Sequence, residues 1–535
     1  MVEKKGIVGM LVVAGAILLL LSGKIQAQEG QSWEQLGKQY RFPKWFTEAK
    51  LGIWVHWGAQ TLPDSGGGWY ARHMYMQDVG SQQFGANAYP YHLRHFGHPS
   101  LFGFKDVIHQ WKAAHLDTDA LLRYFKSIGA KYFVALASHH DHFDNFNSSH
   151  HAWNTVNVGP KKDIIGLFRK SAAKYKMPFG VSSHDDRFMS WWLPAFGSDI
   201  SGPKKGVKYD GYLTKADGAG KWWEGLDPAD LYGLPPEKRT KEWEEQVKKN
   251  WLDRHTELVT KYDPDMLWFD GYGFPYGKYG KEVSRIFLNN HLRKHNNLSV
   301  VVAGKINNEP MVLKDIERGG ASKILPDPWQ GTMTFTHWFY KKDIPSRHNA
   351  KTVIESFTDM ISKNGNLLLN VELLADGTIP PGHKIILDTI GWWMNRNKEA
   401  IYASVPWRVF GDNFKGIVRT KDISVTDEEA YKKQGAAEDF NERTIASPAY
   451  SPNEVRFTRN GNRLYVFVLN PASGELVIPS LGLQSEQRPG KIRRVLLLGN
   501  DKVLSFRQDA GALYVTIPAS VVNGYTAVIR IEGAL

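Results

Sequence analysis

The stretch Met266-Leu267-Trp268-Phe269-Asp270-Gly271 decides the fold, because a short apolar run stops abruptly at a carboxylate and a glycine. Continuous apolar runs of this length are typical of strands buried on both faces, as in parallel sheets. Five further runs end in the same way, in ring-bearing or ionisable side chains: 52–58, 132–140, 179–185, 300–307 and 366–371. The six runs predict a parallel sheet whose polar strand ends share one rim.

The segments between these runs carry apolar residues at helical spacing. Segments 120–128 and 163–175 each have an apolar stripe, and Asp117 or Thr118 and then Asp163 are suitable N-caps. A longer stripe over 240–262 leads into the Asp270 strand. Strands that alternate with helices predict an α/β fold, and we expect a (β/α)8-type barrel whose active site lies at the carboxyl ends of the strands.

The length of 535 residues suggests two domains. Residues 28–407 form the expected barrel-like catalytic domain. Beyond Trp407, short alternating or β-branched runs are separated by Gly, Asn and Pro, which predicts a C-terminal antiparallel β-sandwich over 408–535. The charged stretch 421–443 is expected to be a loop within it.

The N-terminus has the layout of a secretory signal peptide. Lys4 and Lys5 precede an apolar run over 7–21, and small residues such as Ala27 follow. A membrane anchor is the alternative, but about 15 apolar residues are few against the ~20 needed to span. We expect cleavage of residues 1–27, export to the periplasm or the extracellular space, and no membrane span in the mature protein.

Composition narrows the chemistry and the partners. The chain has no cysteine, which excludes disulfides, a Cys nucleophile and cysteine-ligated metals. Its net charge of +12 favours anionic partners, and export favours an acidic or sulfated polysaccharide over nucleic acid. The alternative is that the surplus of Lys only solvates the surface. No feature of the sequence specifies an oligomeric state.

Aromatic side chains gather at the predicted strand ends. Sugar rings stack on flat apolar walls while neighbouring polar groups bind their hydroxyls, so this combination suits a carbohydrate ligand. Taken singly, each Trp is better explained as a core residue, whereas the set at the strand ends is not. The candidates are Trp54, Trp57, Trp69, Trp191, Trp192, Trp268, Trp329 and Trp338.

An ordered series of motifs resembles glycoside hydrolase family 29, the α-L-fucosidases. The resemblance spans roughly residues 33–407 and is carried by Gly52-Ile53-Trp54-Val55-His56-Trp57-Gly58, Trp69-Tyr70-Ala71-Arg72, Ser138-His139-His140-Asp141-His142-Phe143, Leu267-Trp268-Phe269-Asp270-Gly271 and the segment 362–371. Asp376-Gly377, Ile401-Tyr402 and Pro406-Trp407 continue it in order.

The resemblance implies a retaining exo-glycosidase that needs no cofactor and no metal. Asp270 would be the nucleophile, because a carboxylate under the anomeric carbon stabilises the oxocarbenium-like transition state and then captures the sugar. The implied substrate contacts come from the same motifs and from neighbouring strand ends: His56, Trp57, Trp69, Tyr70, His139, His140, His184, Trp268, Lys305 and Trp329.

Two positions compete for the acid/base role. Some relatives resemble Trp-Glu where this chain has Trp329-Gln330, and an amide cannot exchange the catalytic proton at neutral pH. We therefore expect Glu317, which lies twelve residues after Lys305, to be the acid/base, with Glu309 as a reserve candidate. The alternative for Glu317 is a surface ion pair with Arg318 or Lys314.

Departures from the family pattern bear on the substrate. Gly66-Gly67-Gly68 stands where a sugar-binding Glu is common, and Lys305 replaces Arg. Ser182, Ser183 and His184 stand where a Tyr would often follow the strand that begins at Phe179. Loss of a carboxylate is expected to make room for a bulkier and more negative sugar. The hypothesis is an α-L-fucosyl or α-L-galactosyl residue of a sulfated or otherwise substituted glycan.

Two other classes of function stay open at this point. The string His140-Asp141-His142-Phe143-Asp144-Asn145 partly imitates the ligand pattern of zinc hydrolases, although its last histidine is replaced by Asn145. Gly68 and Gln330 also allow a catalytically silent glycan-binding protein.

Overall fold

The computed structural model describes residues 30–77, 87–321, 323–342, 344–414 and 450–535. The predicted signal peptide (1–27) and the predicted charged loop (421–443) lie outside the described residues. Within the described ranges, no helix has both the length and the apolar character needed to cross a membrane.

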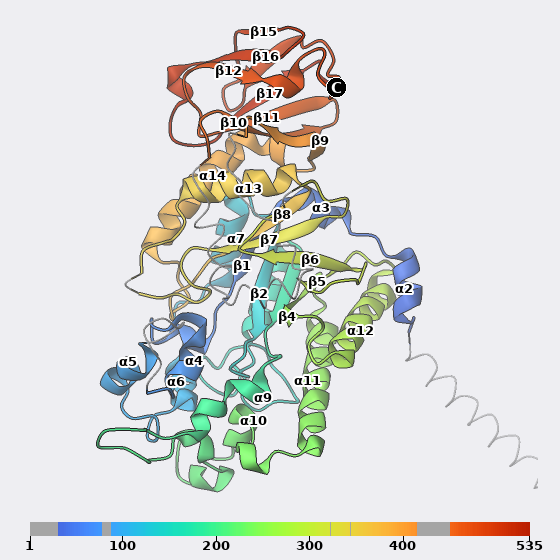
Figure 1. Cartoon of the computed structure of the whole chain (residues 1–535). Helices are drawn as coiled ribbons and strands as arrows, with labels where there is room; N and C mark the ends of the chain where they lie inside the picture. Colours follow the sequence, from blue (N-terminus) through green and yellow to red (C-terminus); the bar gives the residue numbers. More distant parts are fainter. Residues whose placement is uncertain (1–29, 78–86, 322, 343, 415–449) are drawn as a thin grey trace, which may run out of the picture.

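Eight parallel strands close into a barrel in chain order, with β1 paired to both β2 and β8 (Figure 1). The strands are β1 (Leu51–Val55), β2 (Tyr132–Ser138), β3 (Phe179–Ser183), β4 (Met266–Tyr272), β5 (Val301–Lys305), β6 (Val312–Glu317), β7 (Trp329–Thr334) and β8 (Gly365–Asn370). The six predicted runs are β1–β5 and β8, which confirms the barrel prediction. The sequence analysis missed β6 and β7.

Strands β6 and β7 escaped prediction because they carry polar side chains into the barrel interior. Asp315 accepts hydrogen bonds from Trp268 Nε1 (3.0 Å) and from Gln330 Nε2 (2.8 Å), and the Tyr132 hydroxyl donates to Gln330 Oε1 (2.8 Å). All four side chains are buried. A buried polar network is tolerated when its members satisfy one another. Gln330 is therefore a hydrogen-bonded residue of the barrel core.

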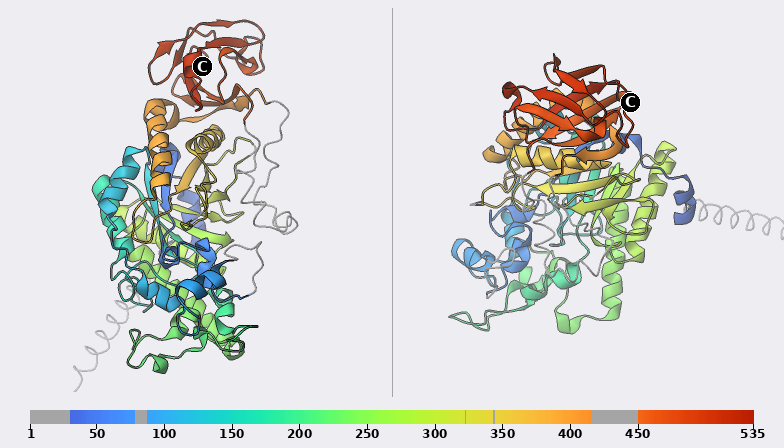
Figure 2. Two further views of the ribbon diagram at one scale, coloured as in Figure 1. Left: turned by 90° about the vertical axis from the view of Figure 1, so that its left-hand side faces the viewer. Right: turned by 45° about the horizontal axis from the view of Figure 1, so that its top comes forward.

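The predicted helices are present and begin at polar caps. They are α7 (Thr118–Ser127), α8 (Ile164–Tyr175) and α11 (Lys241–Tyr262), and Asp117, Asp163 and Thr240 each accept a backbone N–H of the first turn. The other long helices beside the barrel are α12 (Lys278–His295), α13 (Ala350–Ser362) and α14 (Pro381–Ile401) (Figure 2). Shorter helices are α2 (Trp33–Gln39), α3 (Lys44–Ala49), α4 (Tyr70–His73), α5 (Ala88–His95), α6 (Phe104–Gln110), α9 (Phe188–Trp191) and α10 (Pro228–Tyr232).

The C-terminal region forms two antiparallel sheets, which confirms the predicted sandwich. One sheet has the order β14-β13-β17-β11-β10-β9 and the other β12-β16-β15. The strands are β9 (Val405–Asp412), β10 (Glu454–Asn460), β11 (Arg463–Leu469), β12 (Gly474–Ile478), β13 (Arg494–Leu497), β14 (Lys502–Val503), β15 (Phe506–Gln508), β16 (Leu513–Ile517) and β17 (Ala527–Glu532). Because β9 begins at Val405, the expected boundary at 407/408 falls inside this strand.

The sandwich packs on α13 and α14, at the opposite end of the molecule from α9 and α10 (Figures 1 and 2). Trp393 Nε1 of α14 donates to the Thr526 carbonyl (2.7 Å), and Arg456 Nε of β10 lies 2.6 Å from Asp359 Oδ1 of α13. Helices α9 and α10 belong to the long connection after β3. The sandwich therefore supports the barrel away from that connection.

The close approach of β1 and β2 depends on Gly52. A Cβ at this position would overlap the ring of Tyr132, whose hydroxyl is fixed by Gln330. We predict that Gly52→Ala lowers the free energy of unfolding by about 1–3 kcal/mol, because overpacking forces the ring or the strand to shift. Urea unfolding of the purified protein measures the loss.

Gly382→Ala is the matched control for Gly52→Ala. Gly382 lies in α14, and a Cβ there meets nothing within 4 Å. We expect its stability to be unchanged or raised by about 0.4–1 kcal/mol. Equal stability of Gly52→Ala and the wild type would contradict the packing argument.

Candidate active site

One buried ammonium joins two carboxylates at the rim of the barrel. Lys305 Nζ lies 2.8 Å from Asp270 Oδ1 and 2.7 Å from Glu317 Oε2. The three side chains come from the carboxyl ends of the adjacent strands β4, β5 and β6, and each is at most 16% exposed. This is the end at which barrel enzymes carry their catalytic groups.

The shared lysine limits the distance between the two acids. Both carboxylate oxygens contact the same Nζ, so they can be no further apart than the two contacts laid end to end, about 5.5 Å. Carboxyl groups separated by about 5–5.5 Å are typical of retaining glycosidases, whereas inverting enzymes leave a gap of about 6.5–9.5 Å for water. The pair Asp270 and Glu317 therefore fits a double-displacement mechanism.

Two histidines contact the other oxygen of Asp270. His140 Nε2 and His184 Nδ1 each lie 3.4 Å from Asp270 Oδ2, and they follow β2 and β3. Burial by itself raises the pKa of Asp270, but Lys305 first, and then His140 and His184, hold this pKa well below its ordinary value. Asp270 is consequently ionised at neutral pH, as a nucleophile must be.

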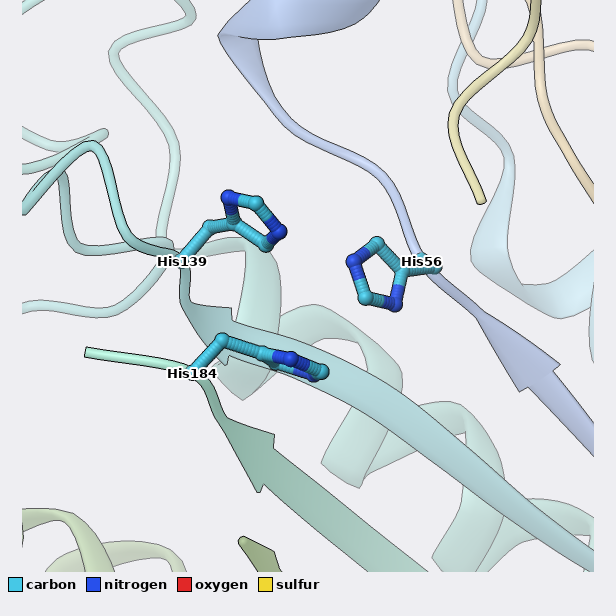
Figure 3. Close-up of side chains that lie close together, drawn as sticks. All are labelled: His56, His139 and His184. Atoms are coloured by element: carbon cyan, nitrogen blue, oxygen red, sulfur yellow. The ribbon is translucent and has the colours of Figure 1, made fainter. Parts of the chain in front are cut away.

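Three histidine rings lie close together at the carboxyl ends of neighbouring strands (Figure 3). His56, His139 and His184 follow β1, β2 and β3, and one ring nitrogen from each lies within 4.8 Å of the others. Burial lowers the pKa of His56 and His139 well below the ordinary value and lowers that of His184 to about 4. The three rings are therefore neutral at pH 7, and each neutral ring offers one donor and one acceptor.

Gln60 fixes which nitrogen of His139 carries the hydrogen. The Gln60 side-chain oxygen accepts from the Ala71 N–H (3.2 Å), so its amino group faces His139 Nδ1 (2.9 Å) and donates to it. The hydrogen of the neutral ring is then on Nε2. A metal needs a lone pair at the liganding nitrogen, whereas a hydroxyl oxygen accepts from an N–H. This histidine cluster therefore suits sugar hydroxyls better than a metal ion.

Indole rings wall the same site. The ring of Trp268 packs on those of His184 and Trp54, with centroids 4.9 Å and 4.6 Å away, and the ring of Trp338 lies 5.7 Å from that of His56. On the other side, Trp69 lies 6.4 Å from His140 and is half-buried. Residues far apart in the sequence thus form one apolar cup around the carboxylates.

The structure does not bring three of the predicted contact residues to this cup. Trp57 packs on Trp111 in the core and donates to the Leu374 carbonyl (2.9 Å). The buried Tyr70 hydroxyl is bonded to His92 (2.7 Å). Trp329 is the first residue of β7, so it lies at the amino end of the barrel, opposite the rim, where it donates to the Lys363 carbonyl (2.9 Å). Trp57, Tyr70 and Trp329 therefore pack in the core, whereas His56 and Trp69, the neighbours of the first two in the sequence, reach the site.

The reserve acid also lies elsewhere. Glu309 accepts from Trp33 Nε1 (2.8 Å) and pairs with Lys281 (2.8 Å) on α12. The expected room at the glycine loop is absent as well, because a Cβ on Gly68 would come within 3.0 Å of the buried Phe339 ring. The expectation that the missing Glu enlarges the pocket is therefore wrong, since Phe339 fills the space.

The zinc-like string serves a structural purpose. Arg254 of α11 is fully buried and pairs with Asp144 and with Asp185 (2.8 Å), and His142 Nδ1 lies 2.8 Å from Asp185. Asn145 donates to the Trp57 carbonyl (2.8 Å). His142, Asp144 and Asn145 are thus engaged with Asp185, Arg254 and backbone atoms, whereas His140 lies with His184 and Asp270 in a group that could hold a metal ion.

Sequence reasoning missed two groups at the site. Asp186 lies beside His140, with Oδ1 3.6 Å from Nδ1, and Phe339 packs on His56 and His139. Asp186 could have been found from its position two residues after His184 in the same strand-end loop. Phe339 had no comparable signal, because it follows the unpredicted strand β7.

A closed (β/α)8 barrel with two rim carboxylates in retaining geometry defines a glycosidase type of site. The alpha-L-fucosidase family model matches residues 18–399. The chain belongs to the alpha-L-fucosidase family of glycoside hydrolases, which confirms the resemblance and the enzyme class predicted from the sequence.

Individual relatives are distant. Tissue alpha-L-fucosidase of Rattus norvegicus is 28% identical over 438 residues, covering 77% of this chain and 82% of that protein. Tissue alpha-L-fucosidase of Homo sapiens is 26% identical over 420 residues, covering 74% and 79%. The crystal structure of Thermotoga maritima alpha-fucosidase has a TM-score of 0.65 at 23% identity and covers 94% of this chain and 99% of that chain, which supports the fold.

Lys305 is predicted to set the charge of Asp270. We expect Lys305→Met to lower kcat/KM by about 100-fold or more, because the buried anion of Asp270 is left without its cation. The pKa of Asp270 then rises, and activity is lost at a higher pH as the solution is acidified. The pH dependence of kcat/KM on an aryl α-L-fucoside measures both effects.

Lys305→Arg is the control for Lys305→Met, because it restores the cation in a planar form. We expect its acidic limb to stay at the wild-type pH. An unshifted acidic limb in Lys305→Met would refute the role assigned to this ammonium.

Proposed function

We propose that this protein is an exported retaining exo-glycosidase that removes α-L-fucosyl or α-L-galactosyl residues from a sulfated polysaccharide. The observation that carries the proposal is the bridge from Lys305 to Asp270 and Glu317 at the barrel rim. The family membership and the names of the relatives support an L-fucose-type sugar. The apolar run behind Lys4 and Lys5 supports export.

The bridge suggests how the reaction exchanges acid and base. Before the reaction, Asp270 is anionic on Lys305 and Glu317 carries the proton that it gives to the leaving oxygen. When Asp270 becomes a glycosyl ester it loses its charge, and Glu317 is now the anion that pairs with the same ammonium. Water is then deprotonated by Glu317 and attacks the ester. Lys305 has one anionic partner in both states, so neither step leaves a buried charge unpaired.

The neighbouring groups are suited to binding the sugar. The neutral rings of His56, His139 and His184 offer hydrogen-bond donors and acceptors on one side of Asp270. Trp268 provides a flat apolar wall next to them. A pyranose placed with C1 over Asp270 would meet polar groups at its hydroxyls and an indole at its C–H face.

Charge supports the sulfated substrate. The chain carries 67 Lys and Arg against 55 Asp and Glu, and cations reach the rim, where the Arg187 side chain is 40% exposed. A positive surface attracts sulfate esters over long range, and this attraction weakens as salt screens the charges. The sulfate ester of the substrate is expected at a position of the glycan that faces these cations.

The roles of the two acids are separable with azide. We predict that Asp270→Ala lowers kcat on an aryl α-L-fucoside by about 10⁴-fold or more and that added azide yields the β-fucosyl azide, because azide replaces the missing nucleophile. Glu317→Ala should lose about 10²–10⁴-fold, and azide should then yield the α-fucosyl azide by attacking the ester in place of water. NMR of the products distinguishes the two anomers.

Glu309→Gln is the matched control, because it neutralises the acid that lies away from the site. It should retain wild-type activity. Azide products of the opposite anomeric form, or full activity of Glu317→Ala, would reverse the assignment. Wild-type protein that binds the sugar without turnover would instead identify a glycan-binding protein.

The sulfated substrate is tested by comparing one oligosaccharide before and after chemical desulfation. We predict a higher kcat/KM on the sulfated form and a ratio that falls as NaCl rises from 10 to 300 mM, roughly the range in which the Debye length drops below 10 Å. A ratio of one at every salt concentration would remove sulfation from the proposal.

A further inference from the structure

A third carboxylate, that of Asp186, lies at the catalytic centre. It follows His184 by two residues in the loop after β3, and its side chain is 18% exposed. Neither the paired acids nor the predicted sugar contacts include it. Its surroundings give it a defined direction toward the sugar site.

The loop holds Asp186 through the residue before it. Asp185 is fully buried and pairs with Arg254 of α11 (2.8 Å) and with His142 (2.8 Å). Asp185 is fixed against α11, and of the residues on either side of it His184 contacts Asp270 and Asp186 contacts His140. A buried, multiply bonded ion pair restricts the geometry of such a loop.

The two oxygens of Asp186 have different surroundings. Oδ1 is inaccessible to solvent, lies 3.6 Å from His140 Nδ1 and 3.9 Å from Arg187 Nε, and makes no hydrogen bond among the described residues. Oδ2 lies over Gly271, the residue after the nucleophile, so closely that a Cβ there would overlap it. Gly271 has φ +83°, which also favours glycine. Oδ1 is therefore the enclosed oxygen, and Oδ2 is the oxygen that lies at the end of β4, next to the residue that follows Asp270.

We propose that Asp186 is a specificity-determining residue that accepts a hydrogen bond, through Oδ2, from one free hydroxyl of the sugar held over Asp270. The inference rests on the proposed function and sharpens it. A sulfate ester on that hydroxyl would place an anion against a largely buried carboxylate, so this hydroxyl must be unsubstituted. Any sulfate must sit elsewhere on the glycan.

Charges from every side bear on Asp186. His140 follows β2, Asp270 ends β4, Lys305 ends β5, and Arg187 is its neighbour in the loop. Burial first, and then Asp270, raises the pKa of Asp186 to about 6, against the lowering by His140, Arg187 and Lys305. The carboxylate is the stronger acceptor in its ionised form, so hydroxyl recognition strengthens as the pH rises through about 6 and weakens below it.

The test compares wild type, Asp186→Ala and Asp186→Asn on an aryl α-L-fucoside and on its 2-, 3- and 4-deoxy analogues. We expect Asp186→Ala to lower kcat/KM on the parent by about 10- to 100-fold, as for loss of a charged hydrogen bond. On only one of the deoxy analogues should Asp186→Ala and the wild type have the same kcat/KM, because that analogue already lacks the hydroxyl that Asp186 binds. Asp186→Asn keeps the shape and an acceptor oxygen, so its kcat/KM on the parent substrate should lie between those of Asp186→Ala and the wild type.

Two controls make the outcome decisive. Asp253→Asn changes an aspartate on the outer surface of α11 and should behave as wild type on every substrate. Melting temperatures of all variants check the fold. A parent kcat/KM unchanged by Asp186→Ala, or an equal loss on all four substrates, overturns the inference. Absence of any fucosidase activity in the wild type would instead refute the proposed function.

Discussion

The catalytic centre depends on one buried cation, the ammonium of Lys305. Burial opposes its charge, but Asp270 and Glu317 raise its pKa well above the ordinary value. In return it lowers the pKa of Asp270 and holds the side chains of Asp270 and Glu317 on one ammonium. A compact ammonium can contact two carboxylates at once from different sides, whereas a planar guanidinium favours paired bonds to one. The substitution of Lys for the usual Arg is thus compatible with the chemistry.

A second buried ion pair positions the groups around that centre. Arg254 is fully buried between Asp144 and Asp185, which ties the loop after β2 and the loop after β3 to α11. Such a cluster adds little net stability compared with a well-packed apolar core, but removing one partner is costly, so its value is geometric. The histidines that contact Asp270 lie in these same two loops. The segment 140–145, whose sequence resembles a zinc-ligand pattern, therefore helps to position the active site.

The sequence was most informative where burial and chemistry agree. Apolar runs closed by polar groups identified six barrel strands and placed Asp270 at the carboxyl end of one of them, because parallel strands are buried on both faces. It failed for β6 and β7, where Asp315 and Gln330 point inward and are satisfied by partners distant in the chain. Motif membership also could not separate Trp69, which reaches the site, from its neighbour Tyr70, which faces the core. That distinction depends on which way successive side chains point in a short helix.

Specificity in this site is better explained by charge than by volume. The glycine loop that lacks a carboxylate opens no space, since Phe339 packs against Gly68 and both neighbouring histidines. Negative charge is instead present on the β3 side, at Asp186, and positive charge is present at the rim. A low-dielectric cup strengthens both effects, because an unpaired or repelled charge is costly when water is excluded. A substrate accepted here must therefore match the direction of the charges around Asp270: free hydroxyls toward Asp186 and the histidines, and anionic groups only on the side that faces solvent and the rim cations.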